Sequence, residues 1–285
     1  MKLIDSHAHL DFDDFHEDFD AVLKRAESAG VEKIINIGAD LARSRASVML
    51  ADNYLNIFAT VGVHPEEAGD VDFETIHAEL LEIAESSKKV VGIGETGLDY
   101  YTHHDVIPAK AGIQDSGALD PSSRAGMTKE AKDLQKRLFQ IHIDVARHLG
   151  LPLVVHVRNG KDEEAVNTAY EILKTAGYHK GVIHCFSLDA AWAKRFTDLG
   201  LYLGFTGIVT YKNADSIRDA VLVTLLEKIL IETDCPFLAP QKYRGKRNEP
   251  AYVVEVVEKI AEVKAITVEK VAERTTINAE ELFGI

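Results

Sequence analysis

The first pattern with chemical potential is a pair of histidines one residue apart, His7 and His9. In an extended strand, residues i and i+2 point to the same face, so both imidazoles can face one ion. Such pairs also occur by chance on exposed loops, where they have no joint role. The pair alone therefore leaves a metal site and an exposed loop as alternatives.

Further histidines and carboxylates recur where apolar segments end. Barrel enzymes build their active sites at the C-terminal rim, with residues from several strands. One residue of this kind is usually structural, but so many at strand ends predict a shared metal site. The residues at these ends are His7, His9, His64, Glu95, His156, His184 and Asp234.

The donor types predict which metals would bind. Imidazoles and carboxylates without thiolates suit zinc, manganese, iron or magnesium. The predicted ligands are His7, His9, Glu95, His156, His184 and Asp234. This set exceeds one tetrahedral site, so we predict two divalent ions, which can clamp the attacking and leaving oxygens of a displacement and activate water. We expect Glu95 and Asp234 to be catalytic: Glu95 is suited to bridge the ions, and Asp234 either binds metal or accepts a proton.

A basic segment follows the Asp234 strand. Residues 242–247 (KYRGKR) carry four positive charges in six positions. Guanidinium groups form bidentate contacts with phosphate, and the tyrosine could stack on a base. A solvated basic loop is the alternative. We also expect Arg158 and His64 at the rim, where they could hold an oxyanion.

The two cysteines, Cys185 and Cys235, each follow a predicted ligand. Strand alternation would turn Cys185 toward the helix layer, which predicts a buried structural thiol. A Cys–His nucleophile pair is the alternative. Two cysteines without CxxC spacing argue against a disulfide framework and fit a reducing compartment.

The elements that must position these residues alternate between short β-branched runs and longer amphipathic runs. Eight strands, each followed by a helix, predict a parallel sheet with both faces covered. Eight such units favour a closed (β/α)8 TIM barrel, with residues 1–285 as a single domain; an open doubly wound sheet is the alternative. The first helix is predicted at Asp14–Ala29. The predicted strands are Leu3–Ile4, Val31–Ile37, Ile57–Val63, Val90–Gly94, Leu153–Val157, Val182–Phe186, Leu201–Phe205 and Ile229–Ile231.

Residues 106–127 interrupt this alternation and show neither helical nor strand periodicity. The segment is rich in small residues and proline, and it resembles the translated palindromic repeats that some bacterial genomes insert within reading frames. We expect a flexible surface insertion after the fourth strand, without a direct chemical role.

Composition limits the function classes. Asp and Glu number 46 against 32 Lys and Arg, and the net charge of −14 argues against coating nucleic acid or anionic lipid by bulk electrostatics. The N-terminal residues lack an apolar run after a basic start, so we expect no signal peptide, and no apolar run reaches about 18 residues. We therefore expect a cytoplasmic protein without membrane association. It has no Walker-type motif, and we expect no nucleotide cofactor.

Together, the motifs resemble the TatD family of metal-dependent deoxyribonucleases, over essentially the whole chain apart from the insertion. The resemblance rests on DSHAHLDF (5–12), VGVHPEEA (61–68), GIGETGLDYY (92–101), LGLPLVVHVR (149–158), HCFS (184–187), ETDCPFLAP (232–240) and NAEELF (278–283). It implies that His7, His9, Glu95 and Asp234 hold one ion, and that Glu95, His156 and His184 hold the second. It also implies that His64 touches the scissile phosphate and that Arg158 and Arg244 lie near the substrate backbone.

The resemblance further implies cleavage of DNA phosphodiesters, by a 3′–5′ exonuclease or endonuclease, in DNA repair or degradation. Magnesium is the expected metal, with zinc and manganese as alternatives, and we expect a monomer. Some relatives are linked to removing D-amino acids from tRNA. An aminoacyl-tRNA deacylase, an amidohydrolase or a lactonase on the same barrel is therefore the alternative, although a modified lysine often stands on strand four of amidohydrolases, where this chain has Glu95. A binding protein with a residual metal site is the alternative outside the enzymes.

The sequence departs from the family pattern in three places, which affect access of the substrate to the site rather than the predicted metal ligands. Val157 replaces the usual small polar residue after His156, and Leu188 replaces the usual glycine after HCFS. The insertion enters directly after the strand that carries Glu95. None of these changes removes a predicted ligand, so we expect metal binding to persist.

Overall fold

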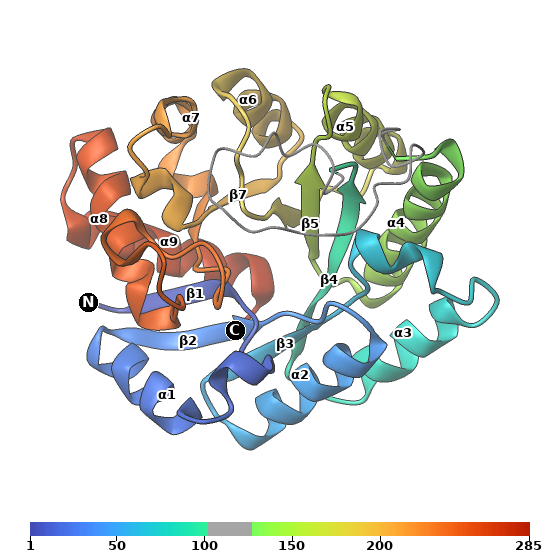
Figure 1. Ribbon diagram of the computed structural model, residues 1–285, viewed down its shortest axis with the longest axis horizontal. Helices are drawn as coiled ribbons and strands as arrows, with labels where there is room; N and C mark the ends of the chain where they lie inside the picture. The colour runs from blue at the N-terminus through green and yellow to red at the C-terminus, as the bar shows by residue number, and fades with distance from the viewer. Residues whose placement is uncertain (102–126) are drawn as a thin grey trace, which may run out of the picture.

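The computed structural model describes residues 1–101 and 127–285. Eight parallel strands form the centre of the molecule, in the order β1 to β8, and helices surround them (Figure 1). The strands are β1 (Leu3–Ala8), β2 (Val31–Asn36), β3 (Ile57–Val61), β4 (Val90–Asp99), β5 (Leu153–Arg158), β6 (Gly181–Ile183), β7 (Tyr202–Phe205) and β8 (Ile229–Ile231). Of the predicted insertion, residues 106–126 lie outside the described residues.

The helices of the outer layer begin at polar caps. Asp40, Thr128, Asp189 and Thr267 each accept a hydrogen bond from a backbone N–H of the first turn, which satisfies a donor that the helix leaves unpaired. The helices are α1 (Phe19–Ser28), α2 (Leu41–Asn53), α3 (Ile76–Glu85), α4 (Lys129–Leu149), α5 (Glu164–Ala176), α6 (Ala190–Asp198), α7 (Asp215–Val223), α8 (Val253–Lys264) and α9 (Val268–Phe283). In the described part of the chain, none is long and apolar enough to cross a membrane.

The sheet closes where its first and last strands meet. A parallel bridge joins Ala8 to Cys235, just beyond the end of β8. Beside it, the buried Asp5 carboxylate accepts hydrogen bonds from the Thr233 N–H, at 2.9 Å, and from the Thr233 hydroxyl, at 2.6 Å. The predicted (β/α)8 barrel is therefore confirmed, and the open doubly wound sheet is wrong.

Several element boundaries differ from the sequence prediction, because polar residues are buried within the strands. The first strand continues from Ile4 to Ala8, and the fourth runs to Asp99 with every residue buried. In place of one helix over Asp14–Ala29, a 3-10 turn (Asp13–Phe15) precedes α1. Apolarity alone underestimates a strand whose polar side chains face a site at the centre of the barrel.

Two glycines allow β4 to pass close to its neighbour. Gly94 and Gly97 have φ angles of 149° and 133°, and a Cβ on Gly97 would lie 2.0 Å from the carbonyl oxygen of His156 on β5. Residues 92–97 also spell GxGxxG, but they lie within β4 rather than opening a helix, so they lack the context of a dinucleotide-binding loop.

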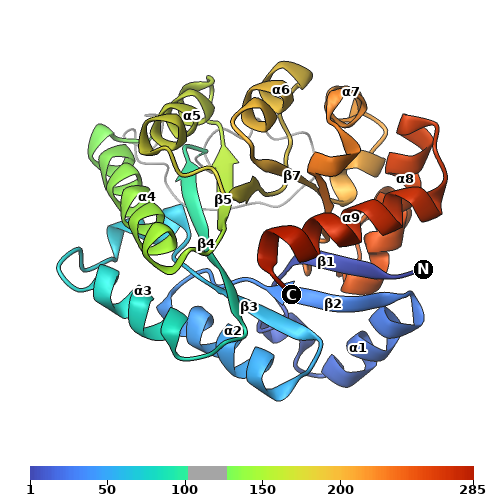
Figure 2. The same ribbon diagram turned by 180° about the vertical axis from the view of Figure 1, so that it is seen from behind.

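Helix α9 closes the barrel at the end where the strands begin. In Figure 2, α9 crosses in front of the strands. Ala279, Leu282 and Phe283 join the inward-facing apolar side chains in one buried cluster, whose barrel members are Ile4, Ile35, Ile37, Val91, Val154, Val182 and Leu230. A separate apolar layer lies between the strands and the surrounding helices. Access to the barrel interior is therefore left at the C-terminal ends of the strands.

Candidate metal centre

The predicted ligands meet at the C-terminal ends of the strands, around the Glu95 carboxylate. Its Oε1 lies 2.9 Å from Nδ1 of His156 and 2.9 Å from Nε2 of His184. Its Oε2 lies 3.5 Å from Nε2 of His7 and 3.9 Å from Nε2 of His9. Each carboxylate oxygen thus faces a different pair of predicted histidine ligands, and Nε2 of His64 also lies 3.7 Å from Oε1.

Asp234 completes the half of the cluster formed by the first strand. Its Oδ1 lies 3.6 Å from Nε2 of His7 and 3.4 Å from Nε2 of His9, and those two nitrogens are 3.2 Å apart. The Asp234 N–H donates to the His7 carbonyl at 2.9 Å, which fixes the loop after β8 against β1. The HxH pair therefore converges as strand alternation predicts.

This arrangement of donors fits divalent metal ions. Ligand atoms that share one ion at about 2.1 Å lie about 3–3.5 Å from one another, close to the separations between these nitrogens and oxygens. The potential ligand atoms of His7, His9 and Glu95 lie within 4.8 Å of one another, as do those of Glu95, His156 and His184. The donors are imidazole and carboxylate groups, which suit the metals predicted from the sequence.

The protonation of the cluster follows from burial and from mutual attraction. Burial alone would raise the pKa of Glu95, but His184, His156 and His7 outweigh it and hold the pKa well below its usual value. Burial alone would lower the pKa of His156, but its hydrogen bonds to Asp99 and Glu95 raise it to about 9. The pKa of His184 is also raised, because the Glu95 and Glu232 carboxylates outweigh the effect of burial. These shifts favour ion pairs between the ionised Glu95 carboxylate and protonated histidines when no metal is bound.

Asp99 supports His156, a contact that the sequence analysis missed. Its Oδ2 lies 3.0 Å from Nε2 of His156, the ring nitrogen that faces away from Glu95. The buried Gln135 of α4 fixes Asp99 in turn: the Asp99 N–H donates to its Oε1, and its Nε2 donates to the Asp99 carbonyl, both at 2.9 Å. Asp99 lies four residues after Glu95, and this even spacing on one strand was the available signal.

Glu232 is the second missed carboxylate. It is fully buried, and its Oε1 lies 3.5 Å from Nδ1 of His184. The same oxygen accepts a hydrogen bond from the Cys185 N–H at 2.5 Å. Glu232 thus lies behind His184 and fixes the chain that carries it. Its position within the ETDCP motif, two residues before Asp234, was the available signal.

Two of the three predicted substrate contacts lie at the same cavity. This cavity of about 680 Å³ is lined by His64, Arg158 and every predicted ligand except the fully buried His7. His64 Nδ1 accepts from the Glu66 N–H at 3.3 Å, and burial lowers the pKa of His64 to about 4. The Arg158 guanidinium packs 3.7 Å from the centre of the Tyr101 ring.

Arg244 and the rest of the basic segment do not line this cavity. The Arg244 guanidinium lies 4.7 Å from the centre of the Tyr211 ring. Lys242 pairs with Glu255, Arg247 pairs with Asp18, and Tyr243 stacks on Tyr252 with ring centres 3.8 Å apart. Much of the predicted phosphate-binding charge is therefore committed to contacts within the protein, and the role of Arg244 stays a prediction.

The expected orientation of Cys185 is wrong. Strand β6 ends at Ile183, so alternation does not extend to Cys185, which has a φ of 46° and lines the cavity. Its Sγ lies 3.7 Å from the Thr206 hydroxyl, and burial raises the pKa of the thiol to about 12. A protonated thiol is a poor nucleophile, which argues against the Cys–His alternative. Cys235, for which the sequence left the direction open, is buried.

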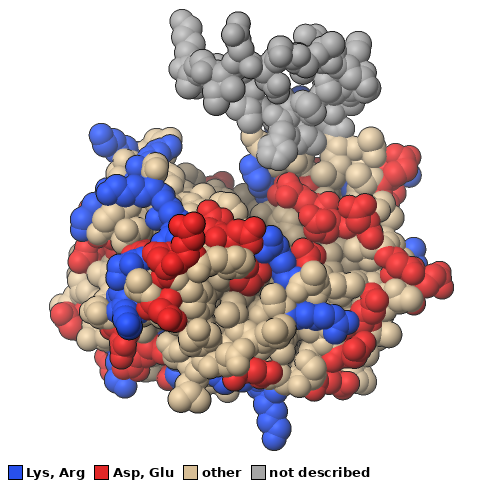
Figure 3. Space-filling model, turned by 60° about the horizontal axis from the view of Figure 1, so that its bottom comes forward, with Lys and Arg blue, Asp and Glu red and all other residues tan. Residues whose placement is uncertain are grey.

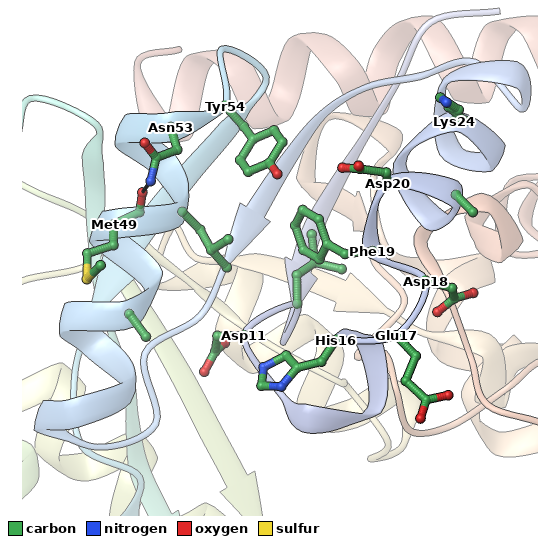
Figure 4. Close-up of a pocket in the computed structure, with 14 residues that line it drawn as sticks. Asp11, His16, Glu17, Asp18, Phe19, Asp20, Lys24, Met49, Asn53 and Tyr54 are labelled. Atoms are coloured by element: carbon green, nitrogen blue, oxygen red, sulfur yellow. Dashed lines mark hydrogen bonds between the residues drawn. The ribbon is translucent and has the colours of Figure 1, made fainter.

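A larger cavity of about 800 Å³ lies on the outside of the barrel, between α1 and α2 (Figure 4). Phe19, Tyr54 and Met49 provide its apolar lining, and Asp18 and Asp20 provide acidic groups. None of the predicted site residues contributes to it. The rim cavity is therefore the candidate active site, because the histidines and carboxylates converge there.

An eight-stranded parallel barrel with this cluster at its rim has the architecture of a metal-dependent hydrolase. The chain belongs to the family described as TatD related DNase, which matches residues 4–284. It is 36% identical to YabD of Bacillus subtilis, over 99% of both chains, and 35% identical to YcfH of Escherichia coli K12, over 100% of this chain and 97% of YcfH. Both relatives are described as uncharacterized metal-dependent hydrolases. The crystal structure of YjjV, a TatD homolog from Escherichia coli, matches with a TM-score of 0.83 at 27% identity, over 99% of this chain and 98% of that one.

Proposed function

We propose that this protein is a deoxyribonuclease that hydrolyses DNA phosphodiester bonds with two divalent metal ions, magnesium being the expected metal. The observation that carries the proposal is the Glu95 carboxylate, whose two oxygens face two separate pairs of histidines. A single carboxylate placed in this way is suited to bridge two ions. The family description supports DNA as the substrate.

The residues divide into two groups around Glu95. His7, His9, Glu95 and Asp234 would hold one ion, and Glu95, His156 and His184 would hold the other. When bound, divalent ions stabilise the charge that develops on the phosphate and make a bound water more acidic. Asp234 would bind an ion or accept a proton at this rim: its neighbouring histidines outweigh burial and lower its pKa, so the carboxylate is ionised at neutral pH.

His64 and Arg158 supply the contacts to the phosphate. Because the Nδ1 of His64 accepts a hydrogen bond from the Glu66 N–H, the neutral ring carries its proton on Nε2. That N–H can donate to a non-bridging phosphate oxygen. Arg158 adds a positive charge at the same cavity.

The test is cleavage of end-labelled single- and double-stranded DNA, with metals added one at a time. Glu95→Gln and Asp234→Asn change only the carboxylates, and we expect each to lower the cleavage rate by about 100-fold or more. Glu269→Gln, at an exposed position of α9, is the matched control and should cleave at the wild-type rate. Circular dichroism checks that the variants are folded.

Wild-type cleavage rates in a folded Glu95→Gln or Asp234→Asn variant would contradict the proposal. A lactone panel, assayed with the same preparations, tests the alternative activity on carboxylic esters. Turnover of a lactone without any cleavage of DNA would replace the nuclease by that alternative.

A further inference from the structure

The rim cavity contains an exposed aromatic side chain that the proposed mechanism does not use. Phe237 lies three residues after Asp234 and lines the cavity beside it, with half of its surface exposed (50%). The other largely exposed large hydrophobic residues in the described ranges are aliphatic or methionine. An aromatic ring at the mouth of a cavity offers an apolar face that a ligand can contact.

The position of Phe237 is well defined despite this exposure. Its N–H donates to the Asp234 carbonyl at 2.9 Å, and its own carbonyl accepts from Nδ2 of the buried Asn248 at 2.7 Å. Its ring meets the ring of Phe12 edge to face, with centres 5.8 Å apart and planes at 81°. The ring is therefore held in place before any ligand arrives, which lowers the entropic cost of binding.

This ring adjoins the candidate metal centre directly. Phe12 lies 4.9 Å from the ring of His9, and Phe237 lies 6.4 Å from it, measured between ring centres. The Arg43 guanidinium covers Phe12 at 3.9 Å and lines the same cavity. A substrate whose phosphate is held in this cavity, beside the candidate metal centre, would thus bring a group attached to that phosphate near Phe237.

We propose that Phe237, supported by Phe12 and Arg43, is a stacking subsite for the nucleobase next to the scissile phosphate. The proposal rests on the deoxyribonuclease function proposed above and adds to it a binding site for one nucleobase of the substrate. A flat aromatic face accepts any base, because every base has a π-face. The subsite therefore contributes affinity for nucleotides over other phosphodiesters, without base sequence specificity.

The experiment compares two phosphodiesters that differ only in their bases. One is a thymidine dinucleotide, and the other carries abasic tetrahydrofuran units in place of both nucleosides. We expect Phe237→Ala to raise KM for the thymidine dinucleotide by about 5- to 100-fold with little change in kcat, while KM for the abasic analogue is unchanged. Phe237→Trp, which keeps an aromatic face, should restore the wild-type KM. Leu55→Ala, which removes a 95% exposed side chain elsewhere, is the control.

Equal changes in KM for both substrates, or no change for either, would overturn the stacking role. Binding of thymidine 5′-monophosphate and of deoxyribose 5-phosphate to the magnesium-loaded protein, measured by calorimetry, tests the subsite without turnover. Wild-type preference for the nucleotide that is lost in Phe237→Ala supports the subsite, and equal affinities overturn it. Base-dependent binding without cleavage of any phosphodiester would instead overturn the deoxyribonuclease proposal and leave the subsite in place.

Discussion

At the scale of single residues, the two ring nitrogens of His156 contact different groups and have different roles. Nδ1 faces Glu95 and the candidate metal centre, whereas Nε2 is paired with the Asp99 carboxylate at 3.0 Å. A carboxylate on the outer nitrogen keeps a proton there and leaves the inner lone pair for a metal. The Gln135 side chain forms two hydrogen bonds with the backbone of Asp99. Helix α4 therefore positions Asp99, and Asp99 in turn orients the His156 ring.

Replacing Asp99 should therefore weaken metal binding without removing a ligand. In Asp99→Asn, the size is retained but the charge that favours the Nε2 proton is lost. We expect about a 10- to 100-fold loss of affinity for one of two Mn²⁺ ions, measured by calorimetry. Asp133→Asn, at an exposed position of α4, is the control. Two unchanged binding constants in Asp99→Asn would show that Asp99 does not support the site.

At the scale of elements, His142 joins α4 to the end of β3. Its side chain is completely buried, and its Nε2 accepts from the Val63 N–H at 3.0 Å. Its Nδ1 donates to the Leu138 carbonyl one turn earlier in the helix, at 2.9 Å. This pair of bonds requires a neutral ring, and burial lowers the pKa of His142 to about 4. The next residue along from Val63 is His64, so the helix also positions a predicted substrate contact.

The lowered pKa predicts a specific dependence of stability on pH. Between the usual pKa of histidine, about 6.5, and about 4, the unfolded chain binds a proton that the folded chain does not. The contribution of His142 is therefore fully present above pH 6.5 and is lost as pH falls toward 4, to an extent of about 3 kcal/mol. Urea unfolding at pH 7.5, 6 and 5 measures it. We expect a smaller loss of unfolding free energy across this range in His142→Gln, and identical pH profiles would contradict the assignment.

At the scale of the whole molecule, the net charge of −14 limits how DNA could bind. Acidic and basic side chains are interspersed on the face shown in Figure 3. Several basic side chains are paired within the protein, including Lys242 and Arg247. Two divalent ions would add four positive charges at the rim, where phosphate has to bind. Charge at the site, rather than on the surface as a whole, would then attract the substrate.

The protonated cluster predicts that metal binding depends on pH. The pKa of His156 is raised to about 9 and that of His184 is also raised, which favours protonated rings at neutral pH in the metal-free protein. A metal must displace a proton from each nitrogen that binds it. We expect the apparent affinity for Mn²⁺ to rise between pH 6 and 8, by about tenfold per pH unit for each proton released.

Calorimetry in buffers with different heats of ionisation counts these protons directly. Because the released protons are taken up by the buffer, the observed heat should vary with its heat of ionisation. An affinity that does not change with pH, together with equal heats in all buffers, would show that the histidines are already neutral before metal binds. Removal of metal with a chelator should lower the melting temperature, since the ions bind only the folded site.

The sequence by itself determined the barrel and the identity of the residues at its rim. Strands that alternate with helices impose parallel pairing, and the C-terminal ends of parallel strands meet at one rim. His7 and His9 could be placed together because a strand has a period of two. Glu95, His156, His184 and Asp234 followed from their positions at strand ends.

Only the tertiary structure decided which groups support those residues and which face the cavity. Asp99, Glu232 and His142 act through hydrogen bonds across separate elements. The spacing of Asp99 and Glu232 along their chain segments indicates their direction but not the partners they contact. For the same reason, the sequence did not predict that Arg244 lies away from the cavity and that Phe237 lines it. Local periodicity sets the direction of a side chain within one element, but packing between elements sets its neighbours, and those neighbours determine its protonation and its access to substrate.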